Sequence, residues 1–236
     1  MKPETTPTVY HINNLVIVPN ALTDAKITAL KQYQKRFSQE AEGRVGGQEI
    51  TEQDKKESLR RNIRSCKVDW IIPNSKFTQE ITQLVHQQIQ SAAIDVYGFD
   101  THRVEPLQYT HYTYVEENEV KDHYDWHTDS HMITKPVPFD RKVSASIQLS
   151  DSDEYTGCNL EFPGLETFFQ DAEKNDKPVS HAIQTKEPIY AEGMRQLMRT
   201  KGTGIFFPSV FSHRVTPIES GERFALVCWL QGPKFR

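Results

Sequence analysis

Cysteine and long apolar runs are both scarce in this sequence. Its 236 residues include three cysteines, Cys66, Cys158 and Cys228, and none of them belongs to a CxxC pair. An odd number of widely separated cysteines does not form a disulfide framework, and the missing CxxC spacing argues against zinc sites and redox pairs. The cysteines are therefore expected to be reduced thiols. No apolar stretch approaches the roughly 20 residues that span a bilayer, so we expect no membrane partner.

Net positive charge is also missing. The 28 lysines and arginines are outnumbered by 32 aspartates and glutamates, and the formal charge of −4 gives no electrostatic case for nucleic acid as an obligatory partner. The opening residues, Met-Lys-Pro-Glu-Thr-Thr-Pro, lack the apolar core of a signal peptide, so a cytoplasmic location is expected. Residues 1–236 are long enough for one domain, and a hydrophobic content of 36% predicts a core built from a few dense strands.

The first hundred residues predict short strands and two helices. Segments 15–18 and 67–72 are apolar enough for strands, and a capped helix follows the first of them. The polar segment 38–58 contains three glycines and predicts a surface loop. The strongest helical pattern begins at Ser75 and ends at Gly98. Its apolar face has the i, i+3, i+4 spacing and consists of Ile81, Leu84, Val85, Ile89, Ala92, Ala93 and Val96.

The second half of the chain changes to short strands broken by turns. Segments 108–115, 143–149 and 155–162 predict strands, which is typical of an antiparallel β-sandwich or barrel. Segment 143–149 carries small residues on one face. Residues 163–203 interrupt this pattern with a polar stretch that is too long for a hairpin loop. Within it, residues 191–200 predict a helix.

One short motif points to a metal. His127 and Asp129 are two residues apart, so on an extended strand both side chains point to the same face. Such a pair alone is more often a surface ion pair, and His123 with Asp125 offers the same spacing. His213, which follows an apolar strand, supplies a third group. Two histidines and one carboxylate are the ligand set of non-haem Fe(II), which leaves coordination positions open.

An arginine near the end of the chain points to an anion. Arg223 directly precedes the apolar run 224–230, where a buried charge without a partner would be costly. Its planar, permanently charged fork suits a bound carboxylate. The alternative is an internal salt bridge to one of the 32 acidic residues.

Six stretches of the second half resemble the 2-oxoglutarate- and Fe(II)-dependent oxygenases, in the prolyl 4-hydroxylase-like branch that includes the PKHD-type hydroxylases. They cover residues 107–112, 124–129, 141–150, 155–162, 207–217 and 221–233. The aromatic pair Tyr124 and Trp126 before His127 matches the family as well, which disfavours His123 as the ligand. Residues 61–70 resemble, more weakly, the segment that precedes the core in these proteins.

The resemblance implies a mainly β fold with flanking helices (α+β). Its core would be a double-stranded β-helix, or jelly roll, over residues 104–233, with the helices of a support region at 10–103 packed outside it. The segment 163–203 would be an insertion into that core and a candidate substrate lid without co-substrate contacts. The family's metal ligands fall on His127, Asp129 and His213, its 2-oxoglutarate anchor on Arg223, and two pocket aromatics on Tyr112 and Trp229.

The activity implied by the resemblance is that of an Fe(II)- and 2-oxoglutarate-dependent dioxygenase, with ascorbate as a candidate reductant. It would hydroxylate a C–H bond of a prolyl residue or another amino-acid side chain, consuming O2 and releasing succinate and CO2. The substrate would be a peptide, a protein or a small molecule. This chain departs from the family in a longer loop between Tyr112 and Tyr124, in the tripeptide Gly157-Cys158-Asn159, and in the length of segment 163–203. These departures concern substrate choice.

Two other functions stay open. A nucleic-acid-modifying oxygenase of the same fold is supported only by a basic cluster, for which a solvated strand edge is the simpler interpretation. The cluster consists of Arg60, Arg61, Arg64 and Lys67. A catalytically silent binding module is disfavoured because every ligand position is intact. For segment 163–203, the alternative to a lid is a solvent-facing decoration.

Overall fold

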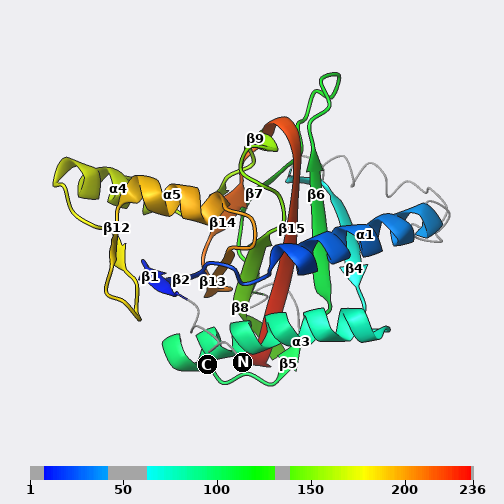
Figure 1. Ribbon diagram of the computed structural model, residues 1–236, viewed down its shortest axis with the longest axis horizontal. Helices are drawn as coiled ribbons and strands as arrows, with labels where there is room; N and C mark the ends of the chain where they lie inside the picture. Colours follow the sequence, from blue (N-terminus) through cyan, green and yellow to red (C-terminus); the bar gives the residue numbers. More distant parts are fainter. Residues whose placement is uncertain (1–7, 42–62, 131–138, 235–236) are drawn as a thin grey trace.

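The computed structural model describes residues 8–41, 63–130 and 139–234, and two antiparallel sheets form its frame (Figure 1). The larger sheet contains β1 (Tyr10–Ile12), β2 (Leu15–Val18), β4 (Lys67–Ile71), β5 (Arg103–Val104), β6 (Leu107–Thr113), β8 (Phe139–Gln148), β9 (Tyr155–Gly157), β13 (Gly204–Pro208) and β15 (Ile218–Pro233). The smaller sheet contains β3 (Arg64–Ser65), β7 (His123–His127), β10 (Leu160–Glu161) and β14 (His213–Val215). A separate hairpin pairs β11 (Ser180–His181) with β12 (Pro188–Ile189).

The two sheets face each other across an internal cavity. The larger sheet has the order β1-β2-β13-β8-β15-β6-β4, with β5 and β9 also paired to β15, and the smaller has the order β10-β14-β7-β3. Thr110 and Ser146 of the larger sheet line the same cavity as Tyr124 and Val215 of the smaller one. This arrangement is a double-stranded β-helix, so the fold expected from the sequence is confirmed.

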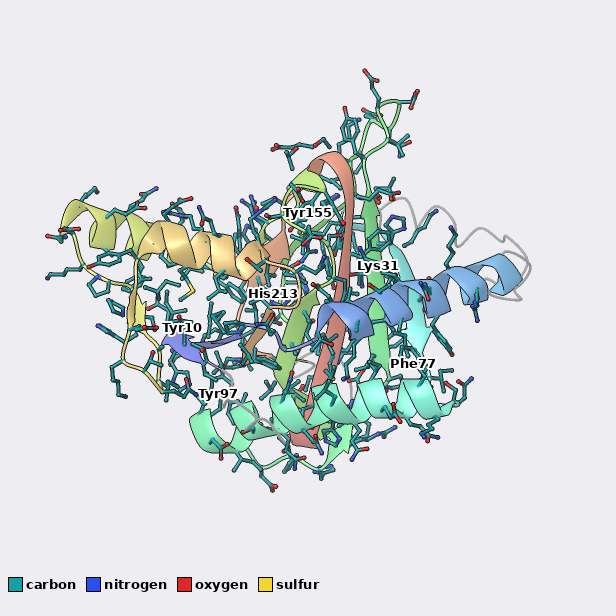
Figure 2. The ribbon with its side chains drawn as sticks, viewed as in Figure 1. Tyr10, Lys31, Phe77, Tyr97, Tyr155 and His213 are labelled. Atoms are coloured by element: carbon teal, nitrogen blue, oxygen red, sulfur yellow. The ribbon has the colours of Figure 1, made fainter. Side chains whose placement is uncertain are left out.

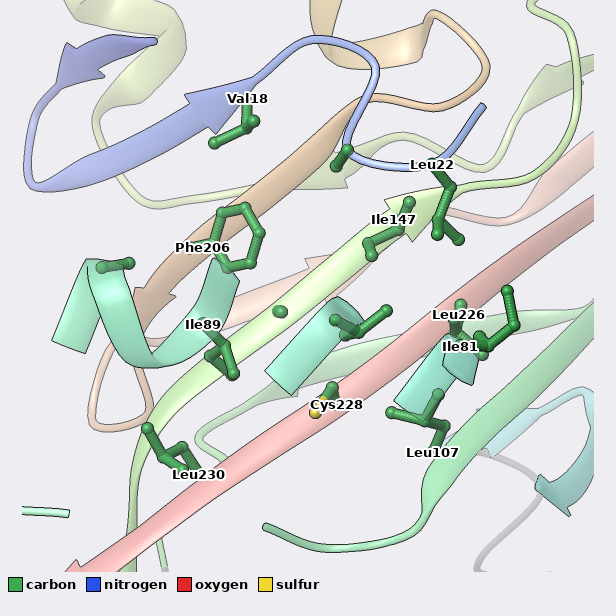
Figure 3. Close-up of a cluster of buried hydrophobic side chains, with 14 of the residues drawn as sticks. Val18, Leu22, Ile81, Ile89, Leu107, Ile147, Phe206, Leu226, Cys228 and Leu230 are labelled. Atoms are coloured by element: carbon green, nitrogen blue, oxygen red, sulfur yellow. The ribbon is translucent and has the colours of Figure 1, made fainter. Parts of the chain in front are cut away.

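Two helices cover the outer face of the larger sheet. They are α1 (Asp24–Ala41) and α3 (Lys76–Ser91), which lie across the sheet in Figure 1. Ile27 and Leu30 of α1 and Ile81 and Ile89 of α3 belong to one buried cluster that also contains Leu226 of β15. Figure 3 shows the α3 residues packed over strands β6, β8, β13 and β15. Burial of these apolar faces holds both helices against the outer face of the sheet.

Helix α3 begins where the sequence predicts and ends differently. Ser75 caps it, because its hydroxyl accepts a hydrogen bond from the backbone N–H of Thr78 at 3.2 Å. After Ser91 the chain makes a π-helical turn, η1 (Ala92–Val96), before Gly98 adopts a left-handed φ of 64°. The wider turn rotates its later side chains away from the face expected for an α-helix. Val96, expected on the buried face, is consequently 36% exposed.

The predicted loop at 38–58 is helical at its start, because α1 continues to Ala41. The residues Gln39, Glu40 and Ala41 favour a helix, and the sequence places the first glycine only at Gly43. Residues 42–62 lie outside the described part of the chain.

The predicted strand at 155–162 is wrong as a single element. Gly157 and Cys158 have φ values of 69° and 51°, so the chain turns sharply between β9 and β10. Strand β9 pairs with β15 in the larger sheet, whereas β10 pairs with β14 in the smaller one. The break therefore transfers the chain from one sheet to the other.

The segment between β10 and β13 contains two helices, α4 (Leu165–Lys174) and α5 (Ala191–Arg199). The second confirms the helix expected at 191–200. The first was not expected, although its buried residues Leu165, Phe169 and Ala172 have the i, i+4, i+7 spacing of a helix. Both helices share a buried cluster with β13. They therefore form a packed layer at one side of the molecule (Figure 1).

The larger sheet draws strands from both halves of the chain, because β2 pairs with β13 and β4 pairs with β6. The division into a support region at 10–103 and a core at 104–233 stays a prediction. Within the described residues, no helix combines the length and apolarity needed to cross a membrane.

We expect Gly157→Ala to destabilise the fold more than Gly98→Ala does. Both glycines have a left-handed φ, which costs about 1–2 kcal/mol for alanine. A Cβ at Gly157 would also overlap the carbonyl oxygen of Pro217, whereas nothing lies within 4 Å of one at Gly98. Overpacking should add roughly 1–3 kcal/mol at Gly157. Urea unfolding measures both losses, and equal losses would contradict the steric explanation.

Candidate metal and co-substrate site

Strands β7 and β14 bring two imidazoles and a carboxylate together. The strands are neighbours in the smaller sheet, and their register pairs His127 with His213. Asp129 follows β7, and its backbone N–H donates to the carbonyl oxygen of Ser209 at 2.9 Å. The ligand atoms of His127, Asp129 and His213 all lie within 4.8 Å of one another. No other such group of His, Cys, Asp or Glu side chains was found in the part of the chain that the structure describes.

Backbone carbonyls fix which nitrogen of each imidazole is protonated. Nδ1 of His127 lies 2.7 Å from the carbonyl oxygen of Asp125, and Nδ1 of His213 lies 3.0 Å from that of Phe211. Since a carbonyl oxygen only accepts hydrogen bonds, each Nδ1 carries the proton. The two Nε2 atoms face Asp129, at 3.7 Å from Oδ1 for His127 and 3.5 Å from Oδ2 for His213. Their lone pairs are thus available to a metal.

The protonation states of the group suit metal binding. Burial, together with the neighbouring His213, lowers the pKa of His127 to about 4, although Asp129 opposes this. Burial alone would raise the pKa of Asp129, but His213 and the hydroxyl of Ser144 lower it below its usual value. At neutral pH the imidazole of His127 is neutral and Asp129 is ionised. These are the forms that bind metals.

Two further groups surround the Asp129 carboxylate. The Ser144 hydroxyl donates to Oδ2 of Asp129 at 2.6 Å and lies 2.9 Å from the Ser209 hydroxyl. Trp229 lines the same cavity, and its buried indole N–H faces Asp129 closely enough to help lower the pKa of that carboxyl.

Arg223 lies in the same cavity and is only 1% exposed. Its Nε and Nη2 both donate to Oε1 of Gln148, at 3.2 and 2.9 Å. No acidic side chain in the described ranges forms an ion pair with it, so the internal salt bridge considered above is not found there. The cross-strand neighbour of Arg223 is Tyr112, whose ring centroid is 5.5 Å from the guanidinium carbon. A buried guanidinium with a neutral partner favours an anionic ligand.

The structure thus brings all six predicted site residues to one cavity between the sheets. These are Tyr112, His127, Asp129, His213, Arg223 and Trp229. His123 lies outside the group of three, and its Nδ1 contacts the carbonyl oxygen of Lys121 at 2.8 Å. The donor set of two imidazoles and one carboxylate fits Fe(II), and a buried arginine in the same cavity fits a carboxylate of a co-substrate.

The sequence did not identify Arg64 as part of this cavity. Its Nη2 donates to Oε1 of Gln108 at 2.9 Å, and its guanidinium carbon lies 4.6 Å from the ring centroid of Tyr124. The solvated basic edge expected there is therefore wrong for Arg64, although Lys67 is exposed. Arg60 and Arg61 lie outside the described residues. Strand β3 is two residues long, too short for a periodic pattern to show which face Arg64 occupies.

Ser144 and Gln148, the residues that hold Asp129 and Arg223, were also missed individually. The sequence feature that could have identified them is the strand at 143–149 with small side chains on one face. A strand that lines a cavity needs such small side chains to leave room for a ligand. Their hydrogen bonds to distant residues leave no local pattern.

The lowered pKa of His127 predicts a pH-dependent stability of the metal-free protein. An unfolded histidine titrates near 6.5 and the folded one near 4, so between these values the unfolded state binds more protons. Stability should rise from pH 4 to 6.5, by up to roughly 3 kcal/mol from this residue. Urea unfolding across this range, compared with His127→Asn, measures the contribution. If the two proteins show the same pH slope, the lowered pKa is refuted.

Comparisons with known proteins agree with this geometry. A family model described as the 2OG-Fe(II) oxygenase superfamily matches residues 107–231, more than half of the 236-residue chain. The chain is also 24% identical over 164 residues to a PKHD-type hydroxylase of Synechococcus sp. (strain CC9902). That match covers 67% of this chain but 56% of the relative, so the chain spans little more than half of the relative's length.

Two solved structures are similar over nearly the whole chain. The viral collagen prolyl hydroxylase of Paramecium Bursaria Chlorella virus-1 has a TM-score of 0.55 at 16% identity, covering 93% of this chain and 97% of that one. A prolyl-4-hydroxylase of Pseudomonas putida has a TM-score of 0.55 at 17% identity, covering 94% of each chain. At such identities these structures establish only the fold, whereas the match to the family model establishes family membership. The chain therefore belongs to the 2OG-Fe(II) oxygenase superfamily.

Proposed function

We propose that this chain is an Fe(II)- and 2-oxoglutarate-dependent dioxygenase that hydroxylates a C–H bond of a prolyl residue or another amino-acid side chain, releasing succinate and CO2. One observation carries the proposal. A His–Asp–His group and a buried arginine without an acidic partner among the described residues line the same cavity. A ligand with a keto acid at one end and a carboxylate at the other satisfies both. The names of the prolyl hydroxylases with similar structures support the substrate class.

His127, Asp129 and His213 would hold Fe(II) through the two Nε2 atoms and the carboxylate. Bound Fe(II) supplies the redox chemistry that links O2 to decarboxylation of 2-oxoglutarate and to hydroxylation of the substrate. The chain presents its ligands in fixed orientations, because backbone carbonyls hold both imidazoles and Ser144 holds the carboxylate. Little rearrangement is then needed on binding.

Arg223 would bind the distal carboxylate of 2-oxoglutarate through charge-assisted hydrogen bonds. Gln148 fixes the guanidinium from one side, and the buried ring of Tyr112 lies beside it. Burial keeps water away from this end of the cavity, which strengthens the interaction. Tyr112 would therefore border the co-substrate, as the family resemblance implies.

The other functions have less support. The only support for a nucleic-acid substrate was the basic cluster. Its described members do not form one surface, since Arg64 turns into the cavity while Lys67 faces solvent. A silent binding module has no feature in its favour, because the predicted ligand groups are intact. Ascorbate as a reductant and a cytoplasmic location stay predictions.

The proposal of a lid at 163–203 also stays a prediction, with one change. The Met198 carbonyl of α5 accepts a hydrogen bond from Nε2 of Gln148 at 3.2 Å, and the same amide holds Arg223. The segment therefore contacts Gln148, which in turn contacts Arg223, the proposed co-substrate anchor. A lid formed by this segment would move a group that supports 2-oxoglutarate binding.

Replacing His213 with alanine removes one of the two imidazoles, so Mn(II) binding and Fe(II)-dependent 2-oxoglutarate turnover should both be lost. His123→Ala is the matched control, since it removes a histidine of β7 outside the group of three, and it should keep most of both. Calorimetric Mn(II) titration and a decarboxylation assay measure the two properties. Full activity of His213→Ala would exclude the proposed metal site.

Arg223→Ala should weaken 2-oxoglutarate binding by roughly 2–4 kcal/mol, because a buried charge pair would be lost. That loss corresponds to a rise of about 30- to 1,000-fold in the Michaelis constant for 2-oxoglutarate. Arg223→Lys should restore part of the affinity, as a point charge without the fork. Initial rates over a range of 2-oxoglutarate concentrations measure the effect. An unchanged Michaelis constant in Arg223→Ala would place the anchor elsewhere.

A further inference from the structure

A second cavity, larger than the one at the metal group, lies beside it. Its volume is about 430 Å³, and its lining comes from β9 and β10 on one side and from α4 and α5 on the other. Leu160 lines both cavities, and Gln148, which holds Arg223, lines the larger one, so the two cavities adjoin at these residues. None of the predicted metal ligands nor Arg223 lines the larger cavity. The function proposed above does not say which chemical groups this cavity recognises.

Most charges on this lining are neutralised within the chain. Arg195 forms ion pairs with Glu166 at 2.8 Å and with Glu173 at 2.6 Å. Glu161 pairs with Arg214 at 2.7 Å. The thiol of Cys158 is neutral, because burial raises its pKa to about 12.

Arg199 is the exception. Its guanidinium donates to the carbonyl oxygens of Gly157 and Tyr155 and to the side-chain oxygen of Asn159, all of which are neutral. Within the described residues it has no acidic partner, and its Nε–H donates to no acceptor there. Its guanidinium carbon also lies 4.5 Å from the ring centroid of Tyr155. One positive charge is thus fixed at this end of the cavity without compensation.

The remaining lining is largely apolar. Phe162, Leu165, Phe169, Met198 and Ile205 belong to the buried cluster that joins α4 and α5 to β13. The cavity therefore has a charged end at Arg199 and an apolar wall. The acidic side chains around Arg195 disfavour a second negative charge at the other end.

We propose that this cavity binds a small carboxylic acid with an apolar stem, at a site separate from that of 2-oxoglutarate. The carboxylate pairs with Arg199, and the stem packs against Phe162, Leu165 and Phe169. The volume falls within the range of about 300–1,000 Å³ that is typical of small-molecule sites. A monoanion matches the single uncompensated charge, whereas a doubly charged phosphate would leave one charge unmatched. Figure 2 labels Tyr155, whose ring contacts Arg199, and His213 of the candidate metal site.

Hexanoate and its neutral isostere hexanamide are the probes for this site. Calorimetry is done on the full chain with Mn(II) and saturating 2-oxoglutarate, so that the co-substrate cavity is filled. Hexanoate should bind at least roughly 10-fold more tightly than hexanamide, because a charge-assisted hydrogen bond is lost in the amide. Arg199→Gln should remove this preference, and Arg199→Lys should restore part of it.

Arg195→Gln is the matched control, because Arg195 lies on the same helix and lines the same cavity but is already neutralised. It should leave hexanoate binding unchanged. Equal binding of the two probes, no binding of either, or equal effects of the two arginine substitutions would overturn the proposal. Displacement of hexanoate by 2-oxoglutarate would do so as well, since it would place the probe at Arg223. If Arg199→Gln fails to fold, the comparison of hexanoate with hexanamide on the unaltered chain still decides.

Discussion

The candidate site depends on the positive charge of Arg223, which an interior strand of the larger sheet carries. Arg223 lies in β15, which is hydrogen-bonded to β6 on one side and β8 on the other. Its guanidinium is buried, and its side-chain hydrogen bonds go to the neutral amide of Gln148. A buried cation without an anion is unfavourable, and a carboxylate bound beside Arg223 would offset that cost. Under the proposed function, affinity for a carboxylate co-substrate is therefore a property of the sheet.

A single strand sets the spacing between that charge and the metal group. Ser144 and Gln148 are four residues apart in β8 and point to the same face. Ser144 contacts Asp129, and Gln148 contacts Arg223. At about 3.3 Å per residue, the two contacts are separated by roughly 13 Å along the strand. Because β8 is paired with β15 along its length and with β13 from Val143 to Ile147, this separation is rigid.

The sequence predicted those features that depend on spacing within a strand and on resemblance. His127 and Asp129 share a face at a two-residue spacing, and the double-stranded β-helix followed from the family motifs. It did not predict the break at Gly157, because a left-handed glycine leaves the hydrophobic pattern unchanged on either side. The inward turn of Arg64 was missed because its contact, Gln108, is distant in sequence. Val96 was misplaced because it ends a π-helical turn, in which the wider spacing of residues changes the face that they present.

The position of β15 has a consequence for the order in which the chain can fold during synthesis. It is the last of the described strands, yet it lies between β6 and β8 in the larger sheet. Until it leaves the ribosome, these two strands have no shared neighbour, and the apolar face of α3 lacks Leu226 and Leu230, which pack in its cluster. The contacts that complete the sheet join residues far apart in sequence, which favours slow folding. The nascent chain would therefore present open strand edges, the surfaces that chaperones protect from aggregation.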